Sequence, residues 1–269
     1  MNVSRVDNTA DERLVGYATL ADERALAARG WFVAEGRFLA ERLIAGGRHE
    51  LVSLLLNDAA FAALAPVLQS VTAPIYVCES RFFETLTGHH FHRGCLALAA
   101  RPEPRMPLDV ARGARSILVL DRVGNPDNVG SIFRSALALG ADALWLGPGC
   151  ADPLGRKALR TSMAAALALP FAALGGQATC WTEQVARLGE AGFELLALSP
   201  REPGTELREL AREGVPERFA LLLGAEGEGL SSELEALATR RLRIAMRAGV
   251  DSLNVGVAAG IALHALRSL

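Results

Sequence analysis

Five short apolar runs alternate with helical patterns in the carboxyl-terminal part of the chain, and this alternation constrains the fold most strongly. The runs are SILVLD from residue 116, ALWLG from 143, FELLALS from 193, FALLLG from 219 and RLRIAM from 241. A strand that is apolar along its whole length is typical of a parallel sheet buried on both faces. The pattern therefore predicts an α/β fold with helices on both faces of a parallel sheet. Ligands of such sheets bind beyond the carboxyl ends of the strands.

The first hundred residues carry a separate α/β pattern. Strands are predicted over WFVAEG, LVSLLLN, PIYVCE and GCLALAA, and helices over DERALAARG and RFLAERLIAGG. The stretch RPEPRMPLDVARGAR then brings three prolines and no periodicity, which predicts a linker. We therefore expect a smaller α/β domain over 1–100, a linker over 101–115 and the parallel-sheet domain over 116–269.

Composition places the chain among globular proteins, with 51% hydrophobic and 22% charged residues. The longest apolar stretch, residues 163–174, contains Pro170 and is too short to span a bilayer. The start, MNVSRVDNTADERL, is polar and acidic, unlike a secretory signal, so we predict a cytoplasmic protein. Four cysteines without a C-x-x-C pair predict buried free thiols.

The charge balance does not by itself indicate nucleic-acid binding. The formal net charge is −2. However, Lys157 is the sole lysine among 28 basic residues. Arginine binds phosphate and stacks on bases better than lysine does, although a GC-rich genome would give the same bias.

The loop after the first of the five runs carries polar residues that no core requires. In DRVGNPDNVGSIFRSALA, a helix is predicted to open near Asn128 and to carry Arg134. Arg134 follows Gly130 and Ser131 by four and three residues, so it shares their face and leans back toward the loop. Backbone N–H groups and a guanidinium would then form an anion site. The alternative is a solvated arginine beside a structural cap.

A glycine-rich loop follows the run FALLLG. Gly224, Gly227 and Gly229 match neither the dinucleotide-binding fingerprint nor a phosphate-binding loop with Gly-Lys-Ser/Thr. Glycines allow the backbone to approach a ligand closely. Glu226 between them could accept hydrogen bonds or order an arginine, and a tight turn with a solvated glutamate is the alternative.

The third loop leads from RLRIAM into the last helix. We predict that the strand ends at Met246 and that the helix begins near Ser252. Ser252 and Asn254 lie in the predicted first turn, where they can cap the helix or meet a ligand. Capping accounts for Ser252 without requiring Asn254.

These three motifs, in this order, resemble the SpoU/TrmH branch of the SPOUT RNA methyltransferases over residues 116–269. FVAEGRFLAERLIAGG and TGHHFHRGCLALAARP make the first domain similar, less specifically, to the L30e-like RNA-binding extension of that family. The resemblance implies a deep trefoil knot, a homodimer and transfer of a methyl group from S-adenosyl-L-methionine to a ribose 2′-hydroxyl in rRNA or tRNA. By position, it implies cofactor contacts from Gly224, Ile244, Met246 and Leu253.

The same resemblance implies catalytic or substrate-binding roles for Asn128, Arg134, Glu226, Ser252 and Asn254. The role of Arg134 has two alternatives, a general base or a clamp on the phosphate beside the target ribose. Because a guanidinium with a pKa above ~12 rarely loses its proton, we favour the clamp. Asn128 and Glu226 would hold it in place, and Ser252 and Asn254 would organise the third loop.

Three positions depart from the pattern of the resembled family, which often has Pro at Ala245, Gly at Ala164 and Ser at Gly256. They bear on cofactor affinity and loop rigidity, not on the reaction class. No metal is expected, since His89, His90, His92 and Cys95 are poorly spaced for one tetrahedral site.

For RNA binding by the first domain, Arg37, Arg81 and Arg93 are the candidates. His89, His90 and His92 either contact RNA or have a structural role. The stretch GRKALR at 155–160 faces either RNA or solvent. Two other functions are weighed: a non-catalytic RNA-binding or assembly protein on the same scaffold, and a nucleotide-dependent dehydrogenase, whose fingerprint is absent.

Overall fold

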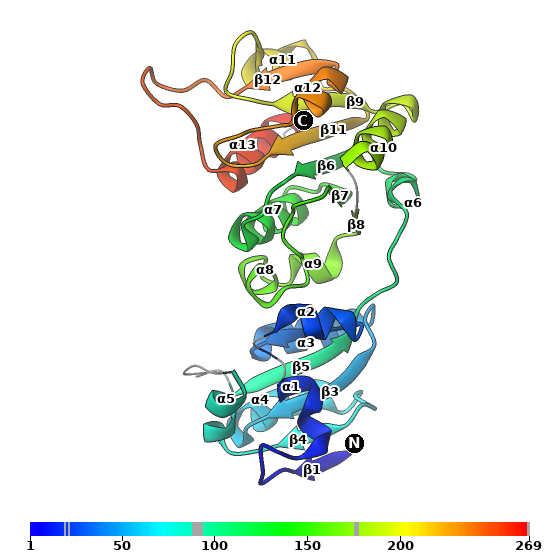
Figure 1. Cartoon of the computed structure of the whole chain (residues 1–269), viewed down its shortest axis with the longest axis vertical. Coiled ribbons are helices and arrows are strands. Elements are labelled where there is room, and N and C mark those ends of the chain that lie inside the picture. Colours follow the sequence, from blue (N-terminus) through cyan, green and yellow to red (C-terminus); the bar gives the residue numbers. More distant parts are fainter. Residues whose placement is uncertain (19, 21, 88–93, 175–177, 268–269) are drawn as a thin grey trace. The chain divides into compact units, whose positions relative to one another are not determined.

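The computed structural model describes all of residues 1–269 except 19, 21, 88–93, 175–177 and 268–269 (Figure 1). The chain forms two compact units. Unit 1 comprises residues 1–103 and 154–167, and unit 2 comprises residues 104–153 and 168–269.

Unit 1 is built on a mixed sheet with the order β1-β4-β3-β5-β2. Strands β1, β4 and β3 are parallel, whereas β5 runs antiparallel to both of its neighbours. The strands are β1 (Val3–Arg5), β2 (Trp31–Glu35), β3 (Leu51–Leu56), β4 (Ile75–Val77) and β5 (Cys95–Ala100). The helices are η1 (Glu12–Leu14), α1 (Val15–Ala18), α2 (Glu23–Ala28), α3 (Arg37–Gly46), α4 (Asp58–Leu68) and α5 (Ser80–Thr87). The α/β pattern predicted for this part is therefore present.

Unit 1 also includes a segment that is distant in sequence, residues 154–167, which carries α8 (Arg156–Thr161). α8 packs against β2. The guanidinium of Arg156 pairs with the buried carboxylate of Glu35 and donates to the carbonyl oxygen of Leu20 at 2.8 Å.

Unit 2 holds a seven-stranded sheet with the order β10-β12-β9-β11-β6-β7-β8, and every strand pair is parallel. The strands are β6 (Ser116–Asp121), β7 (Ala143–Leu146), β8 (Phe171–Ala173), β9 (Glu194–Leu198), β10 (Thr205–Glu206), β11 (Phe219–Gly224) and β12 (Arg240–Arg243). The parallel sheet is confirmed. Sequence reasoning missed β8 and β10 because strands of three and two residues give almost no periodic signal.

Both faces of the central strands are buried, which explains why their sequences are apolar without alternation. Ile117 and Val119 of β6 join a core with Trp145 and Trp181. Leu118 and Leu120 point to the opposite face and are equally buried. The helices of the unit are α6 (Pro107–Ala111), α7 (Pro126–Ala138), α9 (Ala165–Ala168), α10 (Ala178–Glu190), α11 (Leu207–Glu213), α12 (Ser232–Leu237) and α13 (Val255–Arg267), of which α9 crosses the boundary between the units.

The predicted linker 101–115 is partly folded. It contains α6, which begins at Pro107, a residue that suits the first position of a helix. Val110, Ala111 and Ala114 belong to the buried core of unit 2. The three prolines therefore obscured a short helix that the core stabilises.

Two boundaries next to the loops were predicted wrongly. β12 ends at Arg243 instead of Met246, and α13 begins at Val255 instead of near Ser252. In α7 the cap is Asn125, whose side-chain oxygen accepts from the N–H of Asp127 at 2.9 Å. Among the described residues, no helix has the length and apolarity needed to cross a bilayer.

Candidate functional site

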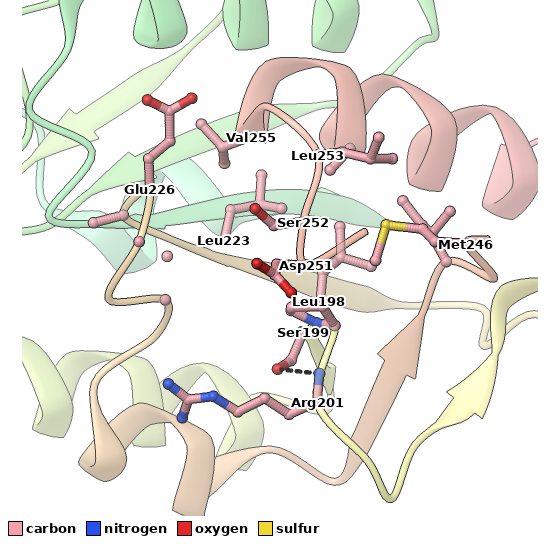
Figure 2. Close-up of a pocket in the computed structure, with 17 residues that line it drawn as sticks. Leu198, Ser199, Arg201, Leu223, Glu226, Met246, Asp251, Ser252, Leu253 and Val255 are labelled. Carbon is pink, nitrogen blue, oxygen red and sulfur yellow. Dashed lines mark hydrogen bonds between the residues drawn. The ribbon is translucent and has the colours of Figure 1, made fainter. Parts of the chain in front are cut away.

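A cavity of about 540 Å³ lies where β9, β11 and β12 end at their carboxyl termini (Figure 2). The residues around it come from three loops that are far apart in sequence. They are 198–201, 223–227, Gly229, Ile244, Met246, 251–253, Val255 and Ala258. Figure 2 shows Leu198, Ser252, Leu253 and Met246 around one space, with Arg201 at its edge. The site is therefore at the edge of the sheet where parallel strands were expected to place a ligand.

The four residues predicted for the cofactor, Gly224, Ile244, Met246 and Leu253, all line this cavity. Glu226 and Ser252 line it too. Sequence reasoning missed the contribution of β9, since residues 198–201 also face the cavity and the N–H of Arg201 donates to Ser199 Oγ at 3.3 Å. The run FELLALS is followed by Pro200, so the sequence marked the end of this strand as clearly as it marked the other loops.

The glycine loop folds back on itself at the mouth of the cavity. An isolated β-bridge joins Ala225 and Gly229, and Gly227 and Gly229 adopt φ of 82° and 77°, where side chains are strained. A Cβ atom on Gly224 would lie 2.1 Å from the carbonyl carbon of Gly229 and 2.2 Å from the nitrogen of Leu230. Gly224 is thus required by the loop's own backbone, before any ligand is considered.

Arg122 attaches this loop to the end of β6. This role of Arg122 was not predicted from the sequence. Its guanidinium donates to the Glu228 carboxylate at 2.6 Å and to the Gly229 carbonyl at 3.3 Å. Its φ is 57°, an uncommon value for a residue with a side chain. The neighbouring buried carboxylate of Asp121 accepts from the N–H of Ser231 at 2.9 Å. Two residues at the end of β6 therefore fix both sides of the glycine loop.

Three of the five predicted catalytic residues meet in one hydrogen-bonded network. The Asn254 amide donates to Asn128 Oδ1 at 2.9 Å and to Glu226 Oε1 at 2.7 Å. Its own oxygen accepts from the N–H groups of Gly256 at 3.0 Å and Val257 at 3.2 Å, so Asn254 caps α13. The cap of α13 is therefore Asn254. The prediction that Ser252 caps this helix was wrong.

Arg134 lies outside this network. It is on the exposed side of α7, and among the described residues no hydrogen bond or ion pair joins it to another side chain. Asn128, six residues earlier, is 5% exposed and faces inward. Six residues turn a helix through about 600°, which places the two side chains on different faces. Asn128 and Glu226 bind Asn254 here, and neither holds Arg134 as had been expected.

The architecture and the sequence both match known proteins. The model of the SpoU rRNA Methylase family matches residues 115–264. An uncharacterized tRNA/rRNA methyltransferase of Mycobacterium tuberculosis is 41% identical over 233 residues, which cover 86% of this chain and 79% of that protein. The 23S rRNA (adenosine(1067)-2′-O)-methyltransferase of Streptomyces azureus is 30% identical, over 71% of this chain and 68% of that protein.

This chain belongs to the SpoU rRNA methylase family. The fold agrees: an AdoMet-bound rRNA methyltransferase from Sinorhizobium meliloti superposes with a TM-score of 0.84 at 22% identity, covering 100% of this chain and 98% of that one.

One departure of this SpoU-family chain from the resembled pattern has a packing explanation. Gly256 stands where serine is common, and a Cβ atom there would lie 2.1 Å from Ser131 Oγ on α7. α13 packs along α7, so glycine permits this close approach while Ser131 keeps its bond to the carbonyl oxygen of Asn128 at 3.0 Å. Nothing in the structure explains Ala245.

Three of the four thiols of this SpoU-family chain have raised pKa values. All four cysteines are free, as predicted, although Cys180 is exposed. Burial raises the pKa of Cys150, beside the end of β6, to about 11. Burial likewise raises the pKa values of Cys78 and Cys95 to about 12. These three thiols are therefore poor nucleophiles at neutral pH.

The candidate RNA-binding arginines of the SpoU-family chain lie in unit 1. Arg37 is exposed at the start of α3. Arg81 on α5 pairs with Glu79 at 2.9 Å and lies over the ring of Phe82. Arg93, with His89, His90 and His92, falls outside the described residues. No group of metal-binding side chains occurs in the part of the chain that the structure describes.

Proposed function

We propose that this chain transfers a methyl group from S-adenosyl-L-methionine to a ribose 2′-hydroxyl in ribosomal or transfer RNA. One observation carries the proposal: the cavity adjoins the hydrogen-bonded network of Asn128, Asn254 and Glu226. The four residues predicted to contact the cofactor line this cavity, namely Gly224, Ile244, Met246 and Leu253. Family membership supports it, as do a relative named for 2′-O-methylation and a fold neighbour described as AdoMet-bound.

The cavity suits a cofactor with an apolar ring and several polar groups. Leu223, Ile244 and Leu253 supply apolar walls, while Gly224, Gly227 and Gly229 line the cavity without side chains and so allow a ligand to approach the backbone closely. Asp251 and Arg201 provide charges of both signs, which suits the amino and carboxylate groups of an amino-acid moiety. When bound, the cofactor supplies a methyl group on a positively charged sulfur.

The residues of the chain then have distinct tasks. Asn254 holds Glu226 and Asn128 in fixed positions, and Ser252 offers a hydroxyl to the same cavity. Arg134 is exposed and free to bind the phosphate beside the target ribose, which orients the 2′-hydroxyl for attack. In this proposal Arg134 acts as a clamp, because a guanidinium rarely gives up its proton, and the proton released by the 2′-hydroxyl passes to solvent water.

The wider organisation is also part of the proposal. Residues 1–100 select the RNA with Arg37, Arg81 and Arg93, through an L30e-like fold, and residues 116–269 bind the cofactor in a trefoil knot. The enzyme works in the cytoplasm as a homodimer. Exposed apolar residues on α7 and α13, namely Leu137, Val257 and Ile261, support the dimer, since isolated chains rarely leave such a group uncovered.

The test is methyl transfer from labelled S-adenosyl-L-methionine to total unmodified RNA, with mapping of the modified ribose. Arg134→Ala should reduce turnover at least ~100-fold, the scale for loss of a positioned catalytic group. Its affinity for S-adenosylhomocysteine, measured by calorimetry, should hardly change. Arg187→Ala on α10 is the matched control, since Arg187 is also exposed. Near-normal turnover by Arg134→Ala would refute the role of Arg134 as a clamp. Cofactor binding by the wild-type chain without any methyl transfer would favour a non-catalytic assembly role.

A further inference from the structure

Unit 1 contains a second cavity, of about 480 Å³, that the methyl-transfer site does not use. It lies between the start of α3, the start of α4 and the segment 154–167. Two arginines, Arg37 and Arg160, line it together with the exposed side chains of Phe38 and Met163. The GRKALR stretch, whose surroundings the sequence left open, thus contributes one wall.

The charge of this cavity favours an anion. Arg37 and Arg160 are exposed, and no ion pair within the described residues neutralises either of them. Glu35 is the one carboxylate among the described lining residues, and Arg156 pairs with it. Two unpaired guanidinium groups therefore face a cavity whose acidic group is already compensated. Paired arginines of this kind suit a phosphate.

The apolar part of the cavity favours a flat ring. Phe38 is 40% exposed, and the guanidinium of Arg42 lies 5.3 Å from the centre of its ring. Met163 is 46% exposed, and its polarizable thioether packs well against aromatic groups. Exposed aromatic and arginine side chains are the surfaces on which unpaired nucleobases stack.

The turn that carries Met163 is held in an uncommon conformation. Met163 and Ala164 adopt φ of 50° and 69°, values that favour glycine. Ala164 is one of the positions where the resembled family often has glycine, so this chain accepts strain there. The bond from Arg156 to Glu35 anchors α8, and this anchor keeps Arg160 and Met163 beside α3. Strain that persists in an anchored turn is typical of a binding segment.

We propose that this cavity binds one unpaired nucleotide of the RNA substrate, with its phosphate between Arg37 and Arg160 and its base against Phe38 and Met163. The inference rests on the proposed function in taking RNA as the substrate. It adds a capture site to the cofactor site and assigns a role to Arg160 and Phe38. RNA strands with an accessible single-stranded nucleotide are then preferred over fully paired duplexes.

The experiment measures binding of a fluorescein-labelled, mixed-sequence 12-nucleotide RNA to the full chain by fluorescence anisotropy over a range of salt. Arg160→Ala should weaken binding about tenfold and lower the salt slope by less than about 0.7, the value for complete loss of one phosphate contact on a single strand, because Arg37 still binds the same phosphate. Arg160→Lys should restore the slope. Phe38→Ala should weaken binding at least about fivefold and leave the slope unchanged, since stacking carries no charge.

Further variants separate a shared phosphate from general charge. The double variant Arg37→Ala/Arg160→Ala should lose less affinity than the product of the two single losses, because both residues hold one group. Arg24→Ala removes the same charge from exposed α2, outside the cavity, and should have little effect. Melting curves must show that each variant is folded.

The outcomes distinguish this inference from the proposed function. Unchanged RNA affinity in Arg160→Ala and Phe38→Ala would overturn the capture site, even if the wild-type chain methylates RNA. Weakened binding in these variants without any methyl transfer by the wild type would support the capture site and overturn the proposed function. If the wild-type chain does not bind the RNA, both fall, and a cavity that binds a protein segment instead would give that result.

Discussion

Replacing Asn254 tests whether one side chain both caps α13 and joins Glu226 to Asn128. Its oxygen accepts from two backbone N–H groups, and its amide donates to two side chains. Asn254→Ser keeps an oxygen that can cap the helix but cannot reach either partner, whereas Asn254→Ala loses both functions. The difference in unfolding free energy between the two variants therefore isolates the cap.

The expected magnitudes follow from the same contacts. Loss of a cap costs about 1 kcal/mol, which is the expected difference between Ala and Ser at this position. Asn254→Ser should itself cost about 1–2 kcal/mol, because Asn128 is buried and its oxygen loses its donor. The bond to Glu226 adds little, since that carboxylate is exposed to water. Asn254→Ala should thus cost about 2–3 kcal/mol in total.

The assay is urea unfolding followed by the fluorescence of Trp145 and Trp181, which lie in the core of unit 2. Trp31→Phe in every variant removes the signal of unit 1, so the transition reports unit 2 alone. A double-mutant cycle between Asn254→Ser and Asn128→Ala should give a coupling of about 1 kcal/mol. Additive effects would refute the bond between the two amides, and equal stability of the Ala and Ser variants would refute the cap.

Three further predictions concern other parts of unit 2. Burial favours a raised pKa for Asp142, but bonds from the backbone N–H groups of Arg115 and Ser116 outweigh it and lower the pKa below 3.8. A group with a lowered pKa stabilises the fold above its unfolded-state pKa, and this contribution is lost as the pH falls through the folded-state pKa. Because Asp142 is 41% exposed and solvent screens its charge, Asp142→Asn should lower the unfolding free energy at pH 7 by less than about 1 kcal/mol, and this difference should disappear in acid; a difference that persists in acid would contradict this. Gly224→Ala should abolish binding of S-adenosylhomocysteine in calorimetry by displacing Gly229, whereas Gly46→Ala, with open space around it, should not; normal affinity of the first variant would show that the loop is not the pocket wall. Sedimentation of the wild type at twice 28.5 kDa, and of Val257→Asp at 28.5 kDa, would support the dimer, and a wild-type monomer at micromolar concentration would rule it out.

The sequence determined the type of sheet and the place of the site. The strand FALLLG is apolar at every position because both faces of β11 are buried, as is typical of a strand in a parallel sheet covered by helices. The glycines after it were found because strand ends and loops are local features of the chain, whereas Ile244, Met246 and Leu253 were implied by the resemblance to the family. Burial and turn formation depend on residues that are close together in sequence, so a sequence pattern is enough to predict them.

Only the tertiary structure decided which polar groups meet. Asn254 and Asn128 are 126 positions apart, and they touch because strand order brings α7 and α13 together. Arg156 and Glu35 are separated by 121 positions, and they pair because residues 154–167 pack within unit 1. The positive φ of Arg122 and the position of Arg134 outside the Asn254 network also could not be predicted from the sequence. A periodic pattern records whether a residue is buried, whereas hydrogen-bond partners depend on how distant segments pack.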